Sequence, residues 1–423
     1  MTRMIEIGKR GRAAARQFAG ASASQKNKAL EAIAAQLEKS SQEILQANQA
    51  DLQAGEAAGL TAALLDRLAL NPGRLAGVIA DLRSVIQLPD PVGEIFEQTV
   101  LPNGLKVHKQ RVPLGVLGVI YEARPNVTVD VAGLALKTGN AAVLRGGSET
   151  INSNRALVQA IRTGLQGSGL PADAIQFVDD TDRRRVHELL QMHQYVDMLI
   201  PRGGAALHAF CRENSRIPVI TGGIGICHLF VDESADLDAS AEVIHNAKVQ
   251  RPSVCNALDT VLVHKNVASQ LLPSLVQRLA DSGVSFRADE SALKHLQSNQ
   301  GQLLPGVAPA GEGDFDTEWL ALILGLKTVE NLEQAIEHIA EHSTGHSDGI
   351  LTGDPQHAQR FVASVDSAAV YVNASTRFTD GAQLGLGAEV AISTQRLHAR
   401  GPMGLRELTT YKWVVQGDYQ VRG

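Results

Sequence analysis

The residue of this sequence best suited to nucleophilic chemistry is Cys255, in the segment QRPSVCNA at positions 250–257. This segment separates a predicted helix from a predicted strand, and loops placed by a rigid scaffold often carry reactive side chains. A thiolate here could attack an acyl carbon, and the neighbouring Arg251 would favour the charged form of the thiol. The alternative is an inert loop cysteine.

The other two cysteines have a simpler explanation. Cys211 falls within a predicted helix and Cys227 within an apolar predicted strand, where a thiol behaves as a small buried hydrophobe. Three cysteines, an odd number in a chain of 423 residues, do not make a disulfide framework. Their number suits a reducing compartment, so we expect a cytoplasmic protein.

Two glycine-bearing turns follow apolar runs and are candidates for phosphate binding: Arg145-Gly146-Gly147-Ser148, and Arg202-Gly203-Gly204. Each turn is expected to open a helix, whose first N–H groups and dipole favour anions. The G-x-G-x-x-G fingerprint of dinucleotide sites is absent from the sequence. Because most such turns only connect a strand to a helix, the turns alone leave both interpretations open.

A metal site is not expected. The cysteines lie 16 and 28 residues apart, without a C-x-x-C pair. His338, His342 and His346 share an i, i+4 spacing, but Gly345 should interrupt the helix before His346. A helix end whose histidines meet the dipole explains this pattern better than zinc does. A cysteine–histidine hydrolase stays open, since nothing selects one of the thirteen histidines as the partner of Cys255.

The elements that would position these residues follow from the hydrophobic pattern. The first 90 residues are helical, with a stripe formed by Leu30, Ile33, Ala34, Leu37, Ile44 and Leu45. Segments 99–101 and 105–108 flank an Asn-Gly turn signal and are predicted to form a hairpin. We expect this hairpin to be an arm, with the late run 411–415 as a candidate partner strand.

From residue 115 onwards, short apolar runs alternate with helical stretches, which predicts parallel sheets covered by helices on both faces. The expected strands are 116–120, 141–144, 175–178, 198–200, 227–231, 259–264, 322–326, 350–351 and 368–372. The expected helices are 127–138, 150–166, 182–192, 204–213, 266–281, 329–341 and 355–364. Because the alternation repeats after residue 250, we expect two α/β domains.

Composition narrows the class of protein. The formal net charge is −6, and the only tight basic cluster, Arg183-Arg184-Arg185, is more typical of a solvated helix face than of a phosphate track. No nucleic-acid partner is therefore expected. No stretch approaches 18 uninterrupted apolar residues, so no membrane span is expected either. The N-terminus lacks the apolar run and cleavage site of a secretory signal.

Several segments, in order along nearly the whole chain, resemble the aldehyde dehydrogenase superfamily. Residues 115–150 resemble its cofactor segment, 248–264 its catalytic cysteine segment and 401–415 its closing segment. Two further stretches, AIEHI at 335–339 and STGHSD at 343–348, resemble the branch that reduces L-glutamate 5-phosphate in proline biosynthesis.

The resemblance implies two Rossmann-like α/β domains and a β-arm for oligomerisation. The cofactor-binding domain would comprise 1–98 and 114–228 with part of 375–405, the catalytic domain 229–374, and the arm 99–113 and 406–423. It also implies an NADP-dependent oxidoreductase that uses NADPH to convert L-glutamate 5-phosphate into L-glutamate 5-semialdehyde and phosphate. The implied partners are further copies of the chain and the glutamate 5-kinase that makes the labile substrate.

For the cofactor, the resemblance implies roles residue by residue. Arg145 falls where the superfamily has a lysine near the adenosine ribose, and Ser148 where NAD-preferring relatives often carry an acidic residue. Together they would accept the 2′-phosphate of NADP, although a shift of one residue would bring Glu149 to the acidic position. Gly146 and Gly147, with the turn 202–204, would meet the rest of the cofactor. Glu318 corresponds to the glutamate at the nicotinamide ribose.

For the reaction, the resemblance makes Cys255 the nucleophile and Asn126 the candidate oxyanion donor, with Arg124 competing for that place. Arg124 and Arg377 are candidates for the substrate's phosphate or carboxylate, and ordinary structural arginines fit equally well. Hydrolytic relatives carry a glutamate ahead of the pair that corresponds to Gly222-Gly223, where this chain has Ile220-Thr221. Since that glutamate activates water, its loss would protect a thioester from hydrolysis.

Two rival hypotheses stay open from the sequence. One is another aldehyde dehydrogenase branch, acylating or hydrolytic, with the same thiol chemistry. The other is a relative without enzymatic activity, kept as a binding or scaffold protein.

Overall fold

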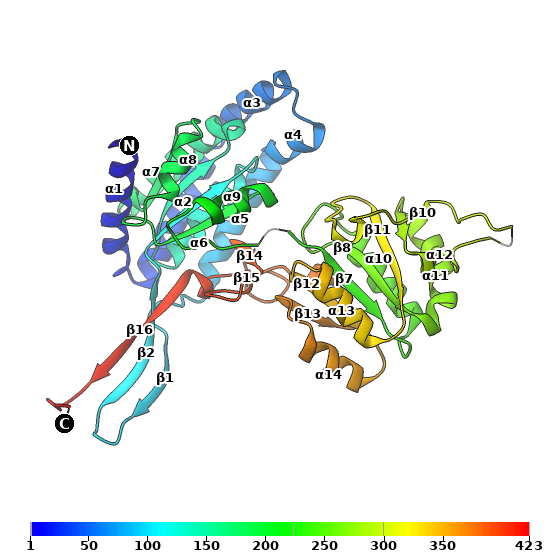
Figure 1. Cartoon of the computed structure of the whole chain (residues 1–423). Coiled ribbons are helices and arrows are strands. Elements are labelled where there is room, and N and C mark those ends of the chain that lie inside the picture. Colours follow the sequence, from blue (N-terminus) through cyan, green and yellow to red (C-terminus); the bar gives the residue numbers. More distant parts are fainter. Residues whose placement is uncertain (1, 223, 299, 423) are drawn as a thin grey trace. The chain divides into compact units, whose positions relative to one another are not determined.

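The computed structural model describes residues 2–222, 224–298 and 300–422 and divides the chain into two compact units (Figure 1). Unit 1 comprises Met1–Thr221, Gly385–Ala391 and Met403–Gly423, and unit 2 comprises Gly222–Leu384 and Ile392–Pro402. In the described part of the chain, no helix is long and apolar enough to cross a membrane. The division into cofactor-binding, catalytic and oligomerisation parts stays a prediction.

Unit 1 begins with helices α1 (Thr2–Phe18), α2 (Ala23–Lys39), α3 (Ser41–Ala57), α4 (Ala62–Leu68) and α5 (Pro72–Gln87). The predicted apolar stripe is divided between two of them, because Ser40 ends α2 and precedes α3. Leu30 and Leu37 are buried in α2, and Ile44 in α3. Pro72 occupies the first turn of α5, where its fixed φ and missing N–H suit a helix start.

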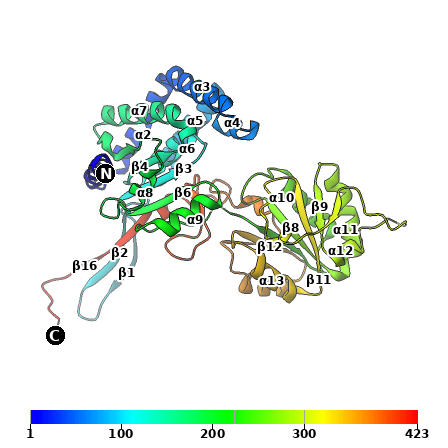
Figure 2. The same cartoon turned by 45° about the horizontal axis from the view of Figure 1, so that its top comes forward.

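The central sheet of unit 1 has four parallel strands in the order β5-β4-β3-β6. They are β3 (Val116–Tyr121), β4 (Ala141–Gly146), β5 (Ile175–Phe177) and β6 (Met198–Arg202), and their helices are α6 (Asn126–Lys137), α7 (Ile151–Ser168), α8 (Arg184–Leu190) and α9 (Ala205–Asn214). Figure 2 shows this unit with the top of Figure 1 turned forward.

Helices cover both faces of this sheet, since successive side chains of a strand point to opposite sides. Tyr121 of β3 points to α6, where its hydroxyl lies 2.7 Å from Thr128 Oγ1. Val116, of opposite parity, faces α1, where a methyl group on Gly11 would lie 3.8 Å away. Because the four strands are parallel, their carboxyl ends lie at one edge of the sheet. The two predicted glycine turns follow strands β4 and β6 at this edge.

The arm is a three-stranded antiparallel sheet of β1 (Ile95–Val100), β2 (Lys106–Pro113) and β16 (Thr409–Gln416), in the order β1-β2-β16. The register runs from Thr409 opposite Pro113 to Gln416 opposite Lys106, so the predicted partner strand is confirmed. Figure 1 shows β16 in red beside β2 in cyan. Gly104 takes a positive φ of 86° in the connecting turn, as the Asn-Gly signal predicted.

Unit 2 holds a seven-stranded parallel sheet in the order β10-β9-β11-β8-β7-β12-β13. Its strands are β7 (Cys227–Val231), β8 (Leu258–His264), β9 (Ser285–Ala288), β10 (Val307–Pro309), β11 (Ile323–Val329), β12 (Ser347–Leu351) and β13 (Ala369–Val372). The pattern had not predicted β9 or β10. The short strands β14 (Ala391–Ser393) and β15 (Gly401–Met403) form a separate pair.

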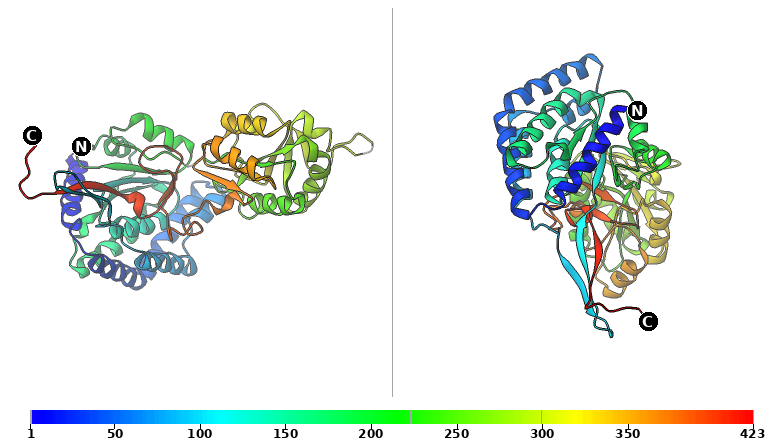
Figure 3. Two further views of the ribbon diagram at one scale, coloured as in Figure 1. Left: turned by 90° about the horizontal axis from the view of Figure 1, so that it is seen from below. Right: turned by 90° about the vertical axis from the view of Figure 1, so that its left-hand side faces the viewer.

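Two cores cover the two faces of this sheet. Leu229 and Val261 point into one core with α10 (Leu237–Val249) and α11 (Lys265–Ala280). The intervening Phe230 points into the other core, with α13 (Leu332–His342) and α14 (Pro355–Ser364). Figure 3 shows helices on both sides of these strands. A small helix, α12 (Glu290–Leu293), follows β9.

Candidate active site

Cys255 lies in the loop between α10 and β8 of unit 2, and its side chain is half-buried. The next residue, Asn256, is buried and fastens the loop to a neighbouring segment. Its Nδ2 donates to Thr379 O at 2.9 Å, and Thr376 Oγ1 donates to Asn256 O at 2.7 Å. The loop position predicted from the sequence is confirmed, and the thiol is attached to a fixed backbone.

Gly225, just before β7, lies directly against the backbone of Cys255. A Cβ at this position would lie 1.6 Å from Cys255 O, so only glycine fits. The Gly225 N–H donates to Glu318 Oε1 at 3.0 Å. Burial raises the pKa of Glu318, and the hydrogen bond from Gly225 opposes that rise. The structure thus brings Glu318 and Cys255 to opposite sides of one glycine. The preceding Gly223 lies outside the described residues.

Cys211 and Cys227 are both buried, one in α9 and one in β7, as predicted. Burial raises the pKa of Cys211 to about 11 and that of Cys227 well above its ordinary value. Their thiols are therefore protonated at neutral pH. The Cys227 thiol donates to Cys255 O at 3.3 Å, which makes it a structural neighbour of the candidate nucleophile.

Arg377 belongs to the segment that fastens the Cys255 loop. Its Nε donates to Gln250 Oε1 at 3.0 Å. Burial lowers the pKa of Arg377, the nearby Arg251 lowers it further, and attraction to Asp380, Cys255 and Cys227 opposes the fall. The positive charge of Arg377 therefore acts on Cys255, and a second positive charge, that of Arg251, lies near Arg377.

The STGHSD stretch holds strand β7 and the segment just before it, which contains Gly225. Thr344 Oγ1 accepts from Ile226 N at 3.0 Å and donates to Ile224 O at 2.9 Å. Asp348 Oδ1 accepts from the backbone N–H of His228 at 2.9 Å and lies 3.0 Å from Nδ1 of the same residue. Sequence reasoning treated this stretch only as a family signature and missed its structural role, which depends on contacts across more than a hundred residues.

The histidines of α13 pack against aromatic rings. The helix ends at His342, before Gly345 with its φ of 69°, as predicted. His338 packs against Phe315 and His342, and burial lowers its pKa to about 2. Among the residues that the structure describes, no cluster of three or more histidine, cysteine or carboxylate side chains could hold a metal ion.

In unit 1, the first glycine turn surrounds a buried arginine. Arg145 donates from Nη1 to Gly146 O at 2.8 Å and from Nη2 to Thr181 O at 3.2 Å. Its buried Nε has no hydrogen-bond partner in the part of the chain that the structure describes. A Cβ on Gly146 would lie 2.1 Å from Asn154 Nδ2, and one on Gly147 would lie 2.0 Å from Glu149 Oε1. Both glycines are therefore required, and Ser148 is exposed beyond them.

The second turn opens α9, with Arg202 at the end of β6 and Gly204 as the N-cap residue. Two carboxylates accept backbone N–H groups at this edge of unit 1, and sequence reasoning missed Glu122. Glu122 Oε2 accepts from Gly204 N at 3.3 Å, and Glu149 Oε1 accepts from Ala123 N at 2.7 Å. Ala123 has a positive φ of 40°, which is costly for a residue other than glycine.

The two candidates for the oxyanion site also belong to unit 1. Asn126 is the first residue of α6, and its Nδ2 donates to Asp130 Oδ2 at 2.9 Å. Burial raises the pKa of Asp130 to about 6. Arg124 is exposed. Since Cys255 belongs to unit 2, the catalytic role of Asn126 stays a prediction.

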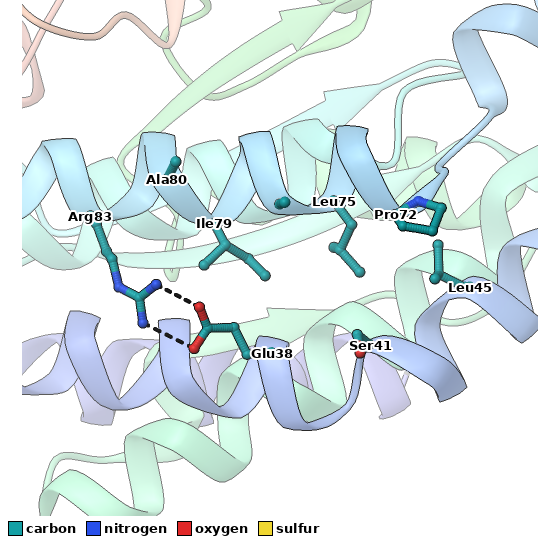
Figure 4. A pocket seen from close by; sticks show the side chains of 9 residues that line it. Glu38, Ser41, Leu45, Pro72, Leu75, Ile79, Ala80 and Arg83 are labelled. Atoms are coloured by element: carbon teal, nitrogen blue, oxygen red, sulfur yellow. Dashed lines mark hydrogen bonds and ion pairs between the residues drawn. The ribbon is translucent and has the colours of Figure 1, made fainter.

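A pocket of about 420 Å³ lies between α2, α3 and α5 of unit 1 (Figure 4). Leu45, Leu75 and Ile79 line it, and an ion pair of Arg83 with Glu38 at 2.6 Å lies at one end. None of the site residues predicted from the sequence lines this pocket. We therefore assign no part of the reaction to it.

Comparison with known proteins adds independent findings. The model of the aldehyde dehydrogenase family matches residues 3–292. The chain is 59% identical over 424 residues to a gamma-glutamyl phosphate reductase of Roseiflexus castenholzii, covering 100% of both chains, and 58% identical to one of Aeromonas salmonicida, covering 98% of this chain and 99% of the other. It superposes on the crystal structure of a gamma-glutamyl phosphate reductase from Thermotoga maritima with a TM-score of 0.96 at 48% identity, over 99% of each chain.

Proposed function

Because the chain belongs to the aldehyde dehydrogenase family and, within it, to the gamma-glutamyl phosphate reductases of proline biosynthesis, we propose that it reduces L-glutamate 5-phosphate to L-glutamate 5-semialdehyde at Cys255. This membership confirms the expected fold and the expected class, an NADPH-dependent oxidoreductase. The rival hypotheses of a hydrolase, a different branch and a scaffold protein are thereby set aside. The roles of individual residues below belong to the proposal.

The observation that carries the proposal is the environment of Cys255, a half-buried thiol on a fastened loop beside Arg251 and Arg377. Positive charge favours the thiolate, which is the nucleophilic form. The thiolate attacks the acyl carbon, and the carbonyl oxygen becomes an oxyanion. The Cys255 backbone N–H and Asn126 are the proposed donors to it. Inorganic phosphate then leaves with the electron pair of the broken C–O bond, so the acyl group stays on sulfur as a thioester.

The residues of unit 1 fit the cofactor. Among the described residues, Nε of Arg145 has no acceptor and could donate to a bound anion. The glycines at 146, 147 and 203 leave no room for side chains in the turns. Helices α7 and α9 begin at these turns and favour an anion. When bound, NADPH supplies the hydride that reduces the thioester. Glu318 is the proposed partner of the ribose next to the nicotinamide.

The chain lacks the glutamate base that would activate water against the thioester. Hydrolytic relatives have a glutamate base where this sequence has Ile220 and Thr221. Ile220 is buried and carries no group that could activate water. Arg377 and Arg124 are the proposed contacts for the anionic groups of the substrate.

The proposed partners are further copies of the chain and the kinase that forms the acyl phosphate. The arm supports the first, because its strand β16 pairs only with β2 in the described structure and carries exposed aromatic side chains. A cytoplasmic location belongs to the same proposal and is supported by the three free cysteines.

The test runs the reaction in the oxidative direction. Glutamate semialdehyde and NADP are incubated with and without inorganic phosphate, using the unmodified protein, Cys255→Ser and the matched control Cys211→Ser. We expect phosphate-dependent formation of NADPH by the unmodified protein and the control, and none by Cys255→Ser. Turnover without phosphate, or an active Cys255→Ser variant, would contradict the proposal.

A further inference from the structure

Three consecutive arginines at the start of α8 differ in their partners. Arg184 donates to Asp182 Oδ2 at 2.7 Å, and Arg185 donates to Asp180 Oδ2 at 2.7 Å. Arg183 is exposed and, within the described chain, no carboxylate pairs with it. Arg184 and Arg185 thus have their charges balanced by carboxylates, whereas the described chain offers no such partner to Arg183. This difference distinguishes the cluster from a uniformly solvated helix face.

The positive charge of Arg183 lies near a second positive charge, that of Arg145. Among the described residues, Arg145 donates to the carbonyl oxygens of Gly146 and Thr181, and its buried Nε has no partner there. Burial lowers the pKa of Arg145, attraction to Glu149 opposes that fall, and the charge of Arg183 adds to it. Two guanidinium groups that repel one another are thus held on adjacent loops, an arrangement that an anion between them would stabilise.

The topology of unit 1 explains why these loops meet. Strands β4 and β5 are parallel neighbours, with Leu144 opposite Phe177, and Val178 N continues the ladder by donating to Leu144 O at 2.9 Å. The turn after β4 and the loop after β5 therefore leave the same carboxyl edge. In open α/β sheets, ligands bind outside this edge.

The carboxylates of the same edge are occupied elsewhere. Asp179 pairs with Arg3 and Arg155, while Asp180 and Asp182 pair with the other two arginines of the cluster. Glu149, which follows Ser148, accepts the N–H of Ala123. The exposed hydroxyl of Ser148 adds a donor. An incoming anion would therefore meet the guanidinium groups of Arg145 and Arg183 and the hydroxyl of Ser148. The neighbouring carboxylates already have ion-pair or hydrogen-bond partners of their own.

We infer that Arg183, together with Arg145, binds the 2′-phosphate of NADP and so determines the preference of this enzyme for NADPH over NADH. The inference rests on the proposed cofactor site of unit 1 and names the residue that precedes α8, which the family resemblance did not supply. A phosphate monoester carries between one and two negative charges near neutral pH and accepts bidentate hydrogen bonds from a guanidinium group. The 2′-hydroxyl of NADH offers neither, so both arginines would stay unpaired beside it.

The test measures binding of two nucleotide fragments to the full chain by calorimetry: 2′,5′-ADP, which carries the 2′-phosphate, and 5′-AMP, which does not. For Arg183→Ala we expect the Kd of 2′,5′-ADP to rise about ten- to a hundredfold, the loss of one charge-assisted hydrogen-bonding partner. The Kd of 5′-AMP should change less than about twofold. In turnover, KM for NADPH should rise while kcat at saturating NADPH is unchanged.

The matched control is Arg184→Ala, which removes the same charge from the neighbouring position, where Asp182 already balances it. We expect it to leave both fragments bound as in the unmodified protein, and Arg183→Lys to restore part of the affinity for 2′,5′-ADP. An equal loss for both fragments, no loss for either, or an equal effect of Arg184→Ala would overturn the inference and leave the Cys255 reaction untouched. If the unmodified protein bound 2′,5′-ADP no better than 5′-AMP, the 2′-phosphate site itself would be refuted.

Discussion

At the scale of single residues, Cys255 and Cys227 are joined by a hydrogen bond, yet their thiols lie in different environments. The Cys227 thiol donates to Cys255 O from a fully buried strand, and burial keeps its pKa well above the ordinary value. Cys255 is half-buried on a loop near two arginines. Because only thiolates react rapidly with alkylating reagents, these environments predict different rates of modification.

Iodoacetamide at pH 7.5 should therefore modify Cys255 at least about ten times faster than Cys227 or Cys211. The measurement is peptide mass spectrometry of samples quenched at successive times. In Cys255→Ser the fast phase should disappear, and in Cys211→Ser it should persist. Modification of Cys227 at the same rate as Cys255 would count against the assignment of the nucleophile.

A buried histidine makes the stability of the fold depend on pH. His346 is fully buried, and burial lowers its pKa to about 4. In the unfolded chain a histidine binds a proton near pH 6.5, so below that pH the unfolded state binds more protons than the folded one. His346 therefore contributes stability that is complete above pH 6.5 and is lost as the pH falls towards 4. Asp130 and Asp259, whose pKa values burial raises to about 6, act in the opposite direction.

Because His346 and the two aspartates change the stability with pH in opposite directions, the effect of His346 is seen by comparing a variant with the unmodified protein. Relative to the unmodified protein, His346→Asn should gain about 2 kcal/mol of unfolding free energy between pH 6.5 and pH 5. Urea unfolding at the two pH values measures the difference. The exposed His193→Asn serves as the control, with no such gain expected. A pH-independent difference for His346→Asn would show that this histidine is protonated equally in both states.

At the scale of elements, the residue before β7 and the loop before β8 meet without a side chain between them. A methyl group on Gly225 would lie 1.6 Å from Cys255 O, and the obstructing atom is backbone, which cannot rotate away. Gly225→Ala must therefore displace the Cys255 loop or the segment that Thr344 holds. Since a displacement of about 1 Å can lower a rate about a hundredfold, we expect kcat to fall by at least that factor.

The control for this prediction is Gly311→Ala, also in unit 2, where the nearest atom to an added Cβ is 3.7 Å away. It should keep full activity. Binding of 2′,5′-ADP, a property assigned to unit 1, should be the same in both variants. An active Gly225→Ala would mean that the loop shifts freely and that its position does not limit the reaction.

The elements show what local sequence can and cannot predict. The strands β3, β4, β7 and β8 were predicted because each is mostly apolar and bounded by helical stretches, the pattern of a strand buried on both faces. Strands β9 and β10 have only four and three residues and lack such a run. The ties between Thr344 and the segment 224–226 join residues about 120 positions apart, and no local pattern encodes that pairing.

The same limit applies to the site. The loop position of Cys255 and the placement of the glycine turns at strand ends could be predicted, because residue types there follow from local pattern and from crowded backbone positions. Glu122 and Arg183 could not, because their significance comes from partners: the N–H of Gly204 in one case and the absence of a carboxylate in the other.

At the scale of the whole molecule, the arm presents a surface that a single chain does not cover. Tyr411, Trp413 and Val415 alternate along β16 and so point to one face, with Trp413 59% exposed. Lys109 lies over the rings of Tyr411 and Trp413, at 4.6 and 5.0 Å from their centroids. In the described sheet β16 pairs only with β2, which leaves its other edge open. An open edge with an apolar face is a template for another strand.

We therefore expect the chain to associate through this face and the double variant Trp413→Asp, Val415→Asp to weaken that association. Two buried carboxylates without partners would oppose burial of the apolar face by several kcal/mol, roughly a thousandfold or more in the dissociation constant. Light scattering coupled to size-exclusion chromatography should show a larger particle for the unmodified protein and a smaller one for the variant. Tyr419→Asp, at a fully exposed position beyond β16, should leave the particle unchanged. An unmodified protein that elutes as a single chain at micromolar concentration would refute the proposed role of the arm, and so would a double variant with unaltered mass.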